Sequence, residues 1–209
     1  MTIAPQVFER EPTRPRITPG GRADIGRVNA LIAAAIGRAT GGPPPRIFTT
    51  LGRHRKLFRA WLRFAGALMP RGKLPRQDTE LVILRVAHNC GCDYEWRHHE
   101  HIAQVEGLTA ADVFNAKQGS SAFAGHQALL IRAADELHEH RTIGDGLWSE
   151  LARHYSDVEL IELCMLIGHY EMLAMTLNSL GVQPDQPPNP RRLALLRRRR
   201  AKAANRRDR

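Results

Sequence analysis

Residues 75–105 read PRQDTELVILRVAHNCGCDYEWRHHEHIAQV. The pattern predicts two helices joined at the bend Cys90-Gly91-Cys92. The first helix is apolar almost all the way round, interrupted by Arg85, and a helix of this kind belongs in a protein interior. Asp78 suits its N-terminal cap, and Glu80 falls in its first turn. We therefore expect the Glu80 carboxylate to enter the core at one end of the helix.

The second helix is predicted to be amphipathic. Its chemically active positions and one apolar position recur at intervals of three and four, which places them on one side: Cys92, Glu95, His99, Ile102 and Glu106. Glu95 and His99, four residues apart, can touch while both face inward. A carboxylate beside an imidazole in a poorly hydrated place is a common way to tune an acid–base pair. His98 and His101 fall on other parts of the helix turn, where we expect them to face solvent.

Each of these residues also has a less specific explanation. Glu80 could be a helix N-terminal carboxylate stabilised by the macrodipole, and His99 could be a hydrogen-bonded core histidine. The Cys92 thiolate is favoured by backbone dipoles at a helix N-terminus and opposed by nearby carboxylates, so the sequence leaves its reactivity open. A metal site is a further alternative, with the candidate ligands Cys92, Glu95, His98, His99 and His101. It lacks a second Cys or His pair at zinc-finger spacing.

The spacing of Glu80, Cys92 and His99 resembles the active-site motif of the carboxymuconolactone decarboxylase and alkylhydroperoxidase D family. In the hydroperoxidase branch the motif is Glu, then Cys-x-x-Cys, then His, and Glu95 here takes the place of the second cysteine. The segment Tyr94-Glu95-Trp96 followed by His99 is similar to the decarboxylase-like branch. The resemblance is strong over roughly residues 74–107 and extends more weakly over about 20–183. It implies an all-helical bundle of the alkylhydroperoxidase D type, assembly into trimers or hexamers, and a site that uses neither metal nor cofactor.

The resemblance implies two kinds of chemistry for the four candidate catalytic residues, which are Glu80, Cys92, Glu95 and His99. In the decarboxylase-like mechanism, loss of carbon dioxide from a carboxylated lactone leaves a dienolate that must be protonated on carbon. His99 would transfer that proton, Glu95 would orient or charge the ring, and Glu80 would complete the relay, while Cys92 would line the pocket. In the hydroperoxidase mechanism, two cysteines cycle between dithiol and disulfide. Glu95 cannot form that disulfide, so either Cys90 would substitute or an outside thiol would resolve a sulfenic acid.

The composition is that of a soluble globular protein. Hydrophobic residues make up 43% and charged residues 25% of a chain of 209 residues, which is long enough for one domain with a real core. We find no apolar run that approaches the ~18 residues of a membrane span, and the N-terminus has prolines and glutamates where a signal peptide needs an apolar stretch. We therefore expect a cytoplasmic protein without a membrane partner. Its three cysteines do not make a disulfide framework, and Cys164 lies in an apolar run that predicts a core position.

The formal net charge of +10 comes almost entirely from the C-terminal tail. Residues 191–209 hold nine arginines and one lysine against one aspartate, so the rest of the chain is close to neutral. Such a tail could bind nucleic acid or another polyanion nonspecifically. Because no aromatic residue interleaves with the arginines and no nucleic-acid-binding signature precedes them, a solvated tail is the simpler interpretation.

The rest of the chain reads as further helices and flexible ends. Helices are expected over 23–39, 46–69 (in two pieces with a break near 52–56), 109–112, 123–138, 148–154 and 156–180. Proline-rich residues 1–20 predict an extended arm, 21–183 the helical domain, and 184–209 a breaker-rich linker and basic tail. No strand-like alternation competes with the helical periods. The predicted fold class is all-α, in an oligomeric bundle.

Three functions follow as hypotheses. The leading one is a non-redox acid–base enzyme of this family, a lyase that acts on a small carboxylated or oxygenated metabolite through Glu80, Cys92, Glu95 and His99. The second is a thiol-dependent peroxidase or disulfide oxidoreductase of the same fold. The third is a binding protein that retained the scaffold and engages a polyanion through residues 191–209.

Overall fold

The computed structural model describes residues 14–185, and every regular element in that range is a helix. This confirms the predicted all-α class. The elements are α1 (Arg22–Thr40), α2 (Arg46–Leu51), α3 (Arg55–Leu68), α4 (Arg76–Asn89), α5 (Asp93–Glu106), α6 (Ala110–Gln118), the 3₁₀ turn η1 (Ser120–Ala122), α7 (Gly125–His140), α8 (Asp145–Leu151) and α9 (Asp157–Leu180).

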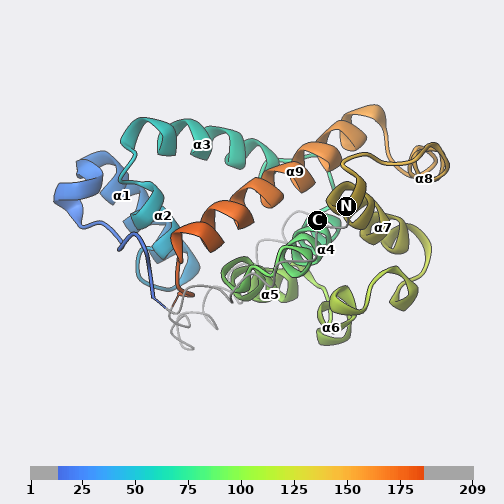
Figure 1. Cartoon of the computed structure of the whole chain (residues 1–209), viewed down its shortest axis with the longest axis horizontal. Coiled ribbons are helices and arrows are strands. Elements are labelled where there is room, and N and C mark those ends of the chain that lie inside the picture. The colour runs from blue at the N-terminus through green and yellow to red at the C-terminus, as the bar shows by residue number, and fades with distance from the viewer. Residues whose placement is uncertain (1–13, 186–209) are drawn as a thin grey trace, which may run out of the picture.

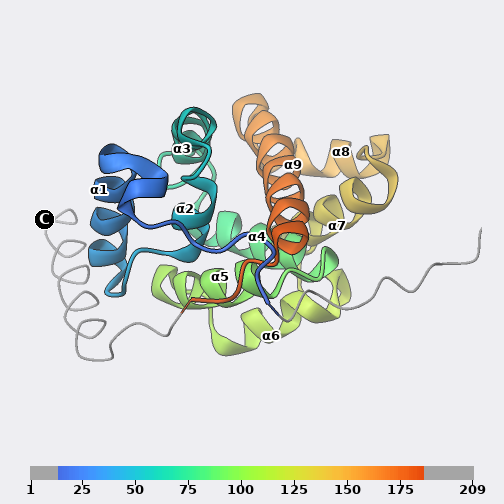
Figure 2. The same cartoon turned by 60° about the vertical axis from the view of Figure 1, so that its left-hand side comes forward.

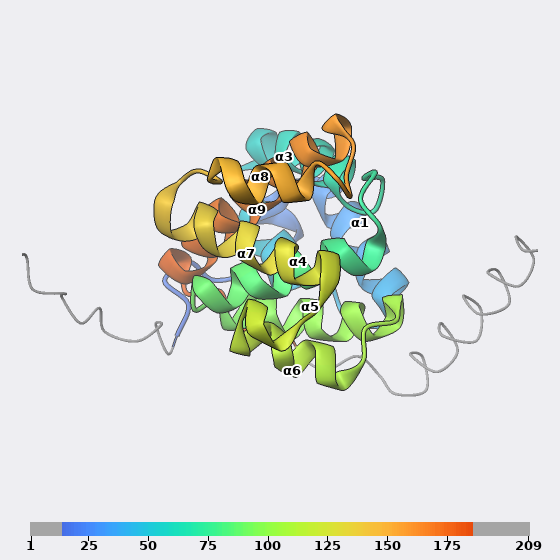
Figure 3. The same cartoon turned by 90° about the vertical axis from the view of Figure 1, so that its right-hand side faces the viewer.

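Helix α4 lies at the centre of the molecule, as its apolar sequence predicts (Figure 3). It packs against α5, α6, α7 and α9. Its side chains from Leu81 to Leu84 are fully buried. Arg85 is the exception, and it binds Asp135 of α7 through two nitrogens while donating to the carbonyl of Ala116 at the end of α6. The charge in the apolar run therefore holds three helices together.

The other helices surround this centre on different sides. Figure 2 shows α1, α2 and α3 on one side and α7 with α8 on the other, while α9 runs between them. Figure 1 shows α9 crossing the molecule obliquely, and α9 packs against α3, α4 and α7. Helices α5 and α6 cover the remaining side of α4. The candidate site lies within this framework, since α4, α5 and α9 supply its residues.

Helix α9 has the bounds that its end signals predict. Ser156 accepts from the Glu159 backbone while Glu159 accepts from the Ser156 backbone, and Gly181 ends the helix with a φ of 66°. By length and composition, α9 is long and apolar enough to cross a membrane. The expectation that no apolar run approaches the length of a membrane span is therefore wrong. More than half of its apolar window is buried in the protein, as in a core helix.

Several local expectations are corrected by the structure. Asp78 does not cap α4: Pro75 holds the capping position, and the Asp78 carboxylate accepts from the Tyr155 hydroxyl at 2.9 Å. Glu80 consequently lies in the second turn of α4. Helices α7 and α8 begin at residues 125 and 145 rather than 123 and 148, and α6 extends to residue 118 rather than 112. The predicted break after α2 is confirmed, because α3 begins at residue 55.

Only part of the predicted arm and none of the basic tail falls within the described residues. The described part of the arm packs on its own chain, where the Arg16 amide donates to the Leu180 carbonyl and Arg53 donates to the Thr18 carbonyl. Residues 1–13 and 186–209 lie outside the described range, so the expectations for the tail stay predictions.

Candidate active site

A tight turn joins α4 to α5 and fixes how their side chains meet. Gly91 adopts a φ of 59°, a left-handed conformation that favours glycine. The Cys92 amide donates back to the Ala87 carbonyl at 2.8 Å, and Cys92 becomes the N-terminal cap of α5. The two helices therefore pack side by side, and the carboxylate of Glu80 comes within reach of α5.

His99 lies between two carboxylates in the interior. Its Nδ1 is 2.7 Å from Glu80 Oε2, and its Nε2 is 3.3 Å from Glu95 Oε2. The three residues are 0 to 2% exposed. The structure thus brings together three of the four candidate catalytic residues, while their catalytic role stays a prediction.

The charge state of this group follows from two opposing effects. Burial alone would lower the pKa of His99, but the carboxylates of Glu80 and then Glu95 outweigh it and raise the pKa to about 9. A protonated ring has an N–H on each nitrogen, so it can donate to both carboxylates at once. The arrangement is a buried imidazolium that can release a proton to a reacting atom, and the two neighbouring carboxylates favour its reprotonation.

Arg76 is a site residue that the sequence reasoning missed. Its Nη2 lies 2.6 Å from Glu80 Oε1, so Glu80 is held by a cation on one oxygen and by His99 on the other. Its Nη1 is buried without a hydrogen-bond partner in the structure. The sequence did contain a signal, since Arg76 and Glu80 are four residues apart on one helix face.

Aromatic side chains of α9 and α3 lie next to His99 and beyond it. The Tyr170 ring meets the His99 ring edge-on at 5.2 Å between centroids. Beside it, His169 stacks on Trp61 at 6.2 Å and meets Phe64 edge-on at 5.2 Å. His169 Nδ1 and Trp61 Nε1 are both buried without a hydrogen-bond partner. No local sequence pattern predicts these contacts, because Trp61 and His169 are distant in the chain and meet only through the packing of α3 on α9.

The cysteines occupy different environments. Cys92 is 1% exposed at the start of α5, where it was expected, whereas Cys90 is half-buried in the turn. Burial, reinforced by the Glu171 carboxylate, raises the pKa of the Cys90 thiol to about 12. None of the three cysteines is joined in a disulfide, and Cys164 is half-buried rather than fully in the core.

The expectation that His98 and His101 face solvent is wrong. Both are half-buried, and the His98 ring stacks on Tyr94 with an interplanar angle of 12°. The tight Cys90-Gly91-Cys92 turn places this side of α5 against α2 and the C-terminal segment, since Tyr94 donates to Asp185 and accepts from the Ile47 amide. Among the described residues, the candidate ligands on α5 do not bring three donor atoms within 4.8 Å of one another.

Comparisons with known proteins agree with this architecture. Residues 55–137 match the model of the carboxymuconolactone decarboxylase family. Among solved structures, a peroxidase-related protein from Ralstonia eutropha with an alkylhydroperoxidase D core superposes with a TM-score of 0.73 at 16% identity, covering 88% of this chain and 96% of that chain. The debrominase Bmp8 superposes with a TM-score of 0.65 at 20% identity, covering 86% of this chain and 97% of its own.

A peroxidase-related protein from Silicibacter sp. also superposes, with a TM-score of 0.70 at 13% identity, covering 87% of this chain and 97% of its own. At these identities the likeness is one of fold. No curated protein sequence matches the chain.

Proposed function

We propose that the chain is a non-redox acid–base enzyme of the carboxymuconolactone decarboxylase family, whose model matches residues 55–137. Its substrate would be a small carboxylated or oxygenated metabolite, and its reaction class that of a lyase. The observation that carries this proposal is the His99 ring held between Glu80 and Glu95. The position that takes the second cysteine in the hydroperoxidase motif is here a carboxylate bonded to His99.

The proposed step is a decarboxylation followed by proton transfer. The carbon–carboxylate bond of the substrate breaks, carbon dioxide leaves, and the electron pair remains on an enolate-type fragment. The His99 imidazolium donates its proton to carbon and becomes neutral, after which solvent reprotonates it beside the charges of Glu80 and Glu95. General acid catalysis of this kind contributes about 10²–10⁴-fold in rate.

Two unpartnered donors, on Arg76 and Trp61, and one unpartnered histidine nitrogen support a substrate rich in polar oxygens. Arg76 Nη1, Trp61 Nε1 and His169 Nδ1 are all buried and lack hydrogen-bond partners in the structure. A buried donor without a partner costs free energy unless something satisfies it, and a carboxylate or carbonyl oxygen does so. The aromatic rings of Trp61, Phe64 and Tyr170 favour a flat, partly apolar substrate body.

Deuterium incorporation tests the proposal directly. A panel of carboxylated lactones and β-keto acids is incubated with the protein in D₂O, and NMR reads carbon dioxide loss and deuterium on the α-carbon. We expect His99→Asn to lose at least about a hundredfold in turnover and Cys92→Ser to keep most of it. Turnover that depends on Cys92 and survives His99→Asn would overturn the acid–base assignment.

A thiol-dependent peroxidase is the second candidate, and the place of Cys92 favours it. Cys92 caps α5, where backbone dipoles stabilise a thiolate. Its sulfur would attack the O–O bond of a hydroperoxide, forming a sulfenic acid and releasing an alcohol, and two equivalents of an outside thiol would restore it. Mass spectrometry of the thiols after peroxide titration separates the candidates, since stoichiometric oxidation of Cys92 with peroxide turnover selects the peroxidase.

We also propose that the protein forms a homo-oligomer in the cytoplasm. An exposed apolar row runs along α9 at intervals of three, four and seven residues: Val158, Ile161, Met165, Met172 and Met175. Large apolar side chains that gather on one helix face are typical of protein–protein contacts. The row is the surface on which we expect subunits to meet.

A further inference from the structure

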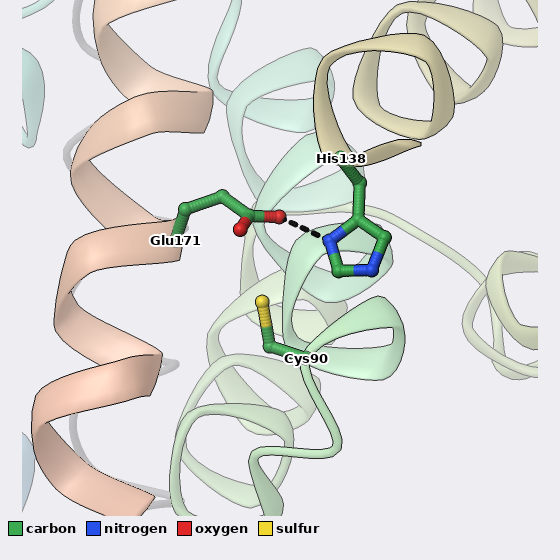
Figure 4. A group of neighbouring side chains, drawn as sticks. All are labelled: Cys90, His138 and Glu171. Carbon is green, nitrogen blue, oxygen red and sulfur yellow. Dashed lines mark hydrogen bonds and ion pairs between the residues drawn. The ribbon is translucent and has the colours of Figure 1, made fainter. Parts of the chain in front are cut away.

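A second group of reactive side chains gathers where three helices meet. Cys90 ends α4, His138 lies in the last turn of α7, and Glu171 lies in the middle of α9. Figure 4 shows the three side chains pointing toward one another, and their donor atoms all lie within 4.8 Å of one another. The group is separate from the His99 group, because Glu80 and Cys90 are about 15 Å apart along the axis of α4. Cys92, the fourth candidate catalytic residue, lies two residues from Cys90.

Glu171 is the residue in this group that needs a further partner. Its side chain is 9% exposed, and His138 Nδ1 lies 2.6 Å from Oε1. Its Oε2 is buried and makes no hydrogen bond in the structure. Arg141 approaches Oε2 only to 3.7 Å, from a side chain that is 67% exposed. A buried carboxylate oxygen that has only this long ion pair as compensation leaves room for a further cation beside it.

We propose that Cys90, His138 and Glu171 bind one divalent transition-metal ion, with Zn²⁺ as the ion that suits the donors best. Thiolate and imidazole select zinc over the hard cations Ca²⁺ and Mg²⁺, and a carboxylate completes many zinc sites. Three protein ligands leave a fourth position for water or another small ligand, which is the pattern of an open zinc site.

The positions of the three side chains suit such a site with small adjustments. Donor atoms bound at about 2.0–2.3 Å to a tetrahedral ion lie roughly 3.3–3.8 Å from one another. The His138–Glu171 contact therefore has to open by about 1 Å, which side-chain rotation supplies. The backbone of Cys90 is held in place by Asn178, which donates to its carbonyl at 3.0 Å. His138 is 32% exposed, so an ion can reach the site from solvent.

Cobalt titration of the full-length, chelator-treated protein tests this proposal. Co²⁺ bound to a thiolate gives a charge-transfer absorption, which we expect to saturate at one equivalent per chain and to disappear when Zn²⁺ is added. Cys90→Ser should abolish the band, and His138→Gln and Glu171→Gln should each weaken Co²⁺ binding at least about tenfold. Matched controls are Cys164→Ser and His140→Gln, which change the same residue types outside the group and should leave binding unchanged.

Circular dichroism checks that each variant is folded. If Cys90→Ser fails to fold, the test is the weaker Co²⁺ binding expected in His138→Gln, because His138 is partly exposed. His140→Gln is then the matched control. The proposal is wrong if no thiolate band appears, if the band persists in folded Cys90→Ser, or if Cys164→Ser removes it equally.

Discussion

His99 lies in a place that by itself would keep its ring neutral. Burial lowers the pKa of a histidine because a charge is poorly solvated in the interior. The carboxylates of Glu80 and Glu95 reverse that tendency, and Glu80 acts more strongly because its contact is shorter. The sequence predicted the Glu95–His99 pair from its spacing along one helix. It could not predict that Glu80 would provide the closer partner, since that contact depends on the turn at Gly91.

Stability should depend on pH through His99. Its pKa is raised from 6.5 to about 9 in the folded protein, so its contribution is fully present below about pH 6.5 and is lost as pH rises through about 9. The contribution of His99 to the free energy of unfolding is on the order of 3 kcal/mol. Urea unfolding from about pH 6 to about 10 measures it. His99→Asn, which cannot titrate, should lack this component, and an equal pH dependence in that variant would contradict the assignment.

The two carboxylates should contribute unequally. Glu80→Gln should lower the pKa of His99 more than Glu95→Gln, because Glu80 supplies the larger favourable interaction. NMR titration of the histidine ring in each variant gives the two values. Equal shifts, or a larger shift in Glu95→Gln, would show that the 2.7 Å contact is not the dominant one.

At the scale of elements, α4 and α9 were predictable to different degrees. The core position of α4 followed from its apolar circumference, and the ends of α9 followed from Ser156 and Gly181. The role of α9 in the site did not, because His169 and Tyr170 are two polar residues in a long apolar helix whose rotation is set by packing on α3 and α4. In helix α1, too, the sequence did not predict which side chains are buried. Gly26 kinks this helix, and Val28 and Leu31 are exposed despite their helical spacing.

Arg85 should be an important connection between helices. Arg85→Leu removes the paired contact with Asp135 and the hydrogen bond to the Ala116 carbonyl, leaving Asp135 with Asn89 as a remaining partner. We expect a loss of about 3 kcal/mol in the free energy of unfolding. Urea denaturation measures it, and adding Asp135→Leu should restore part of the loss. A change below about 0.5 kcal/mol in the free energy of unfolding would show that the Arg85–Asp135 ion pair does not stabilise the fold.

For the whole molecule, the exposed row on α9 should determine assembly. Met165→Glu combined with Met172→Glu places two charges on that row, and we expect the oligomer to dissociate because burying them unpaired is costly. Analytical ultracentrifugation measures the mass. Arg153→Glu, at an exposed position after α8, is the matched surface control. An unchanged mass in the double variant would place the subunit contact elsewhere.

The proposed function depends on a buried, protonated His99 between two carboxylates. The most direct measurement is ¹⁵N NMR of the His99 ring at about pH 8, where an ordinary histidine is neutral. We predict that both ring nitrogens carry a proton at that pH, as a pKa of about 9 requires. A neutral ring with one unprotonated nitrogen would contradict the proposed proton-donor site.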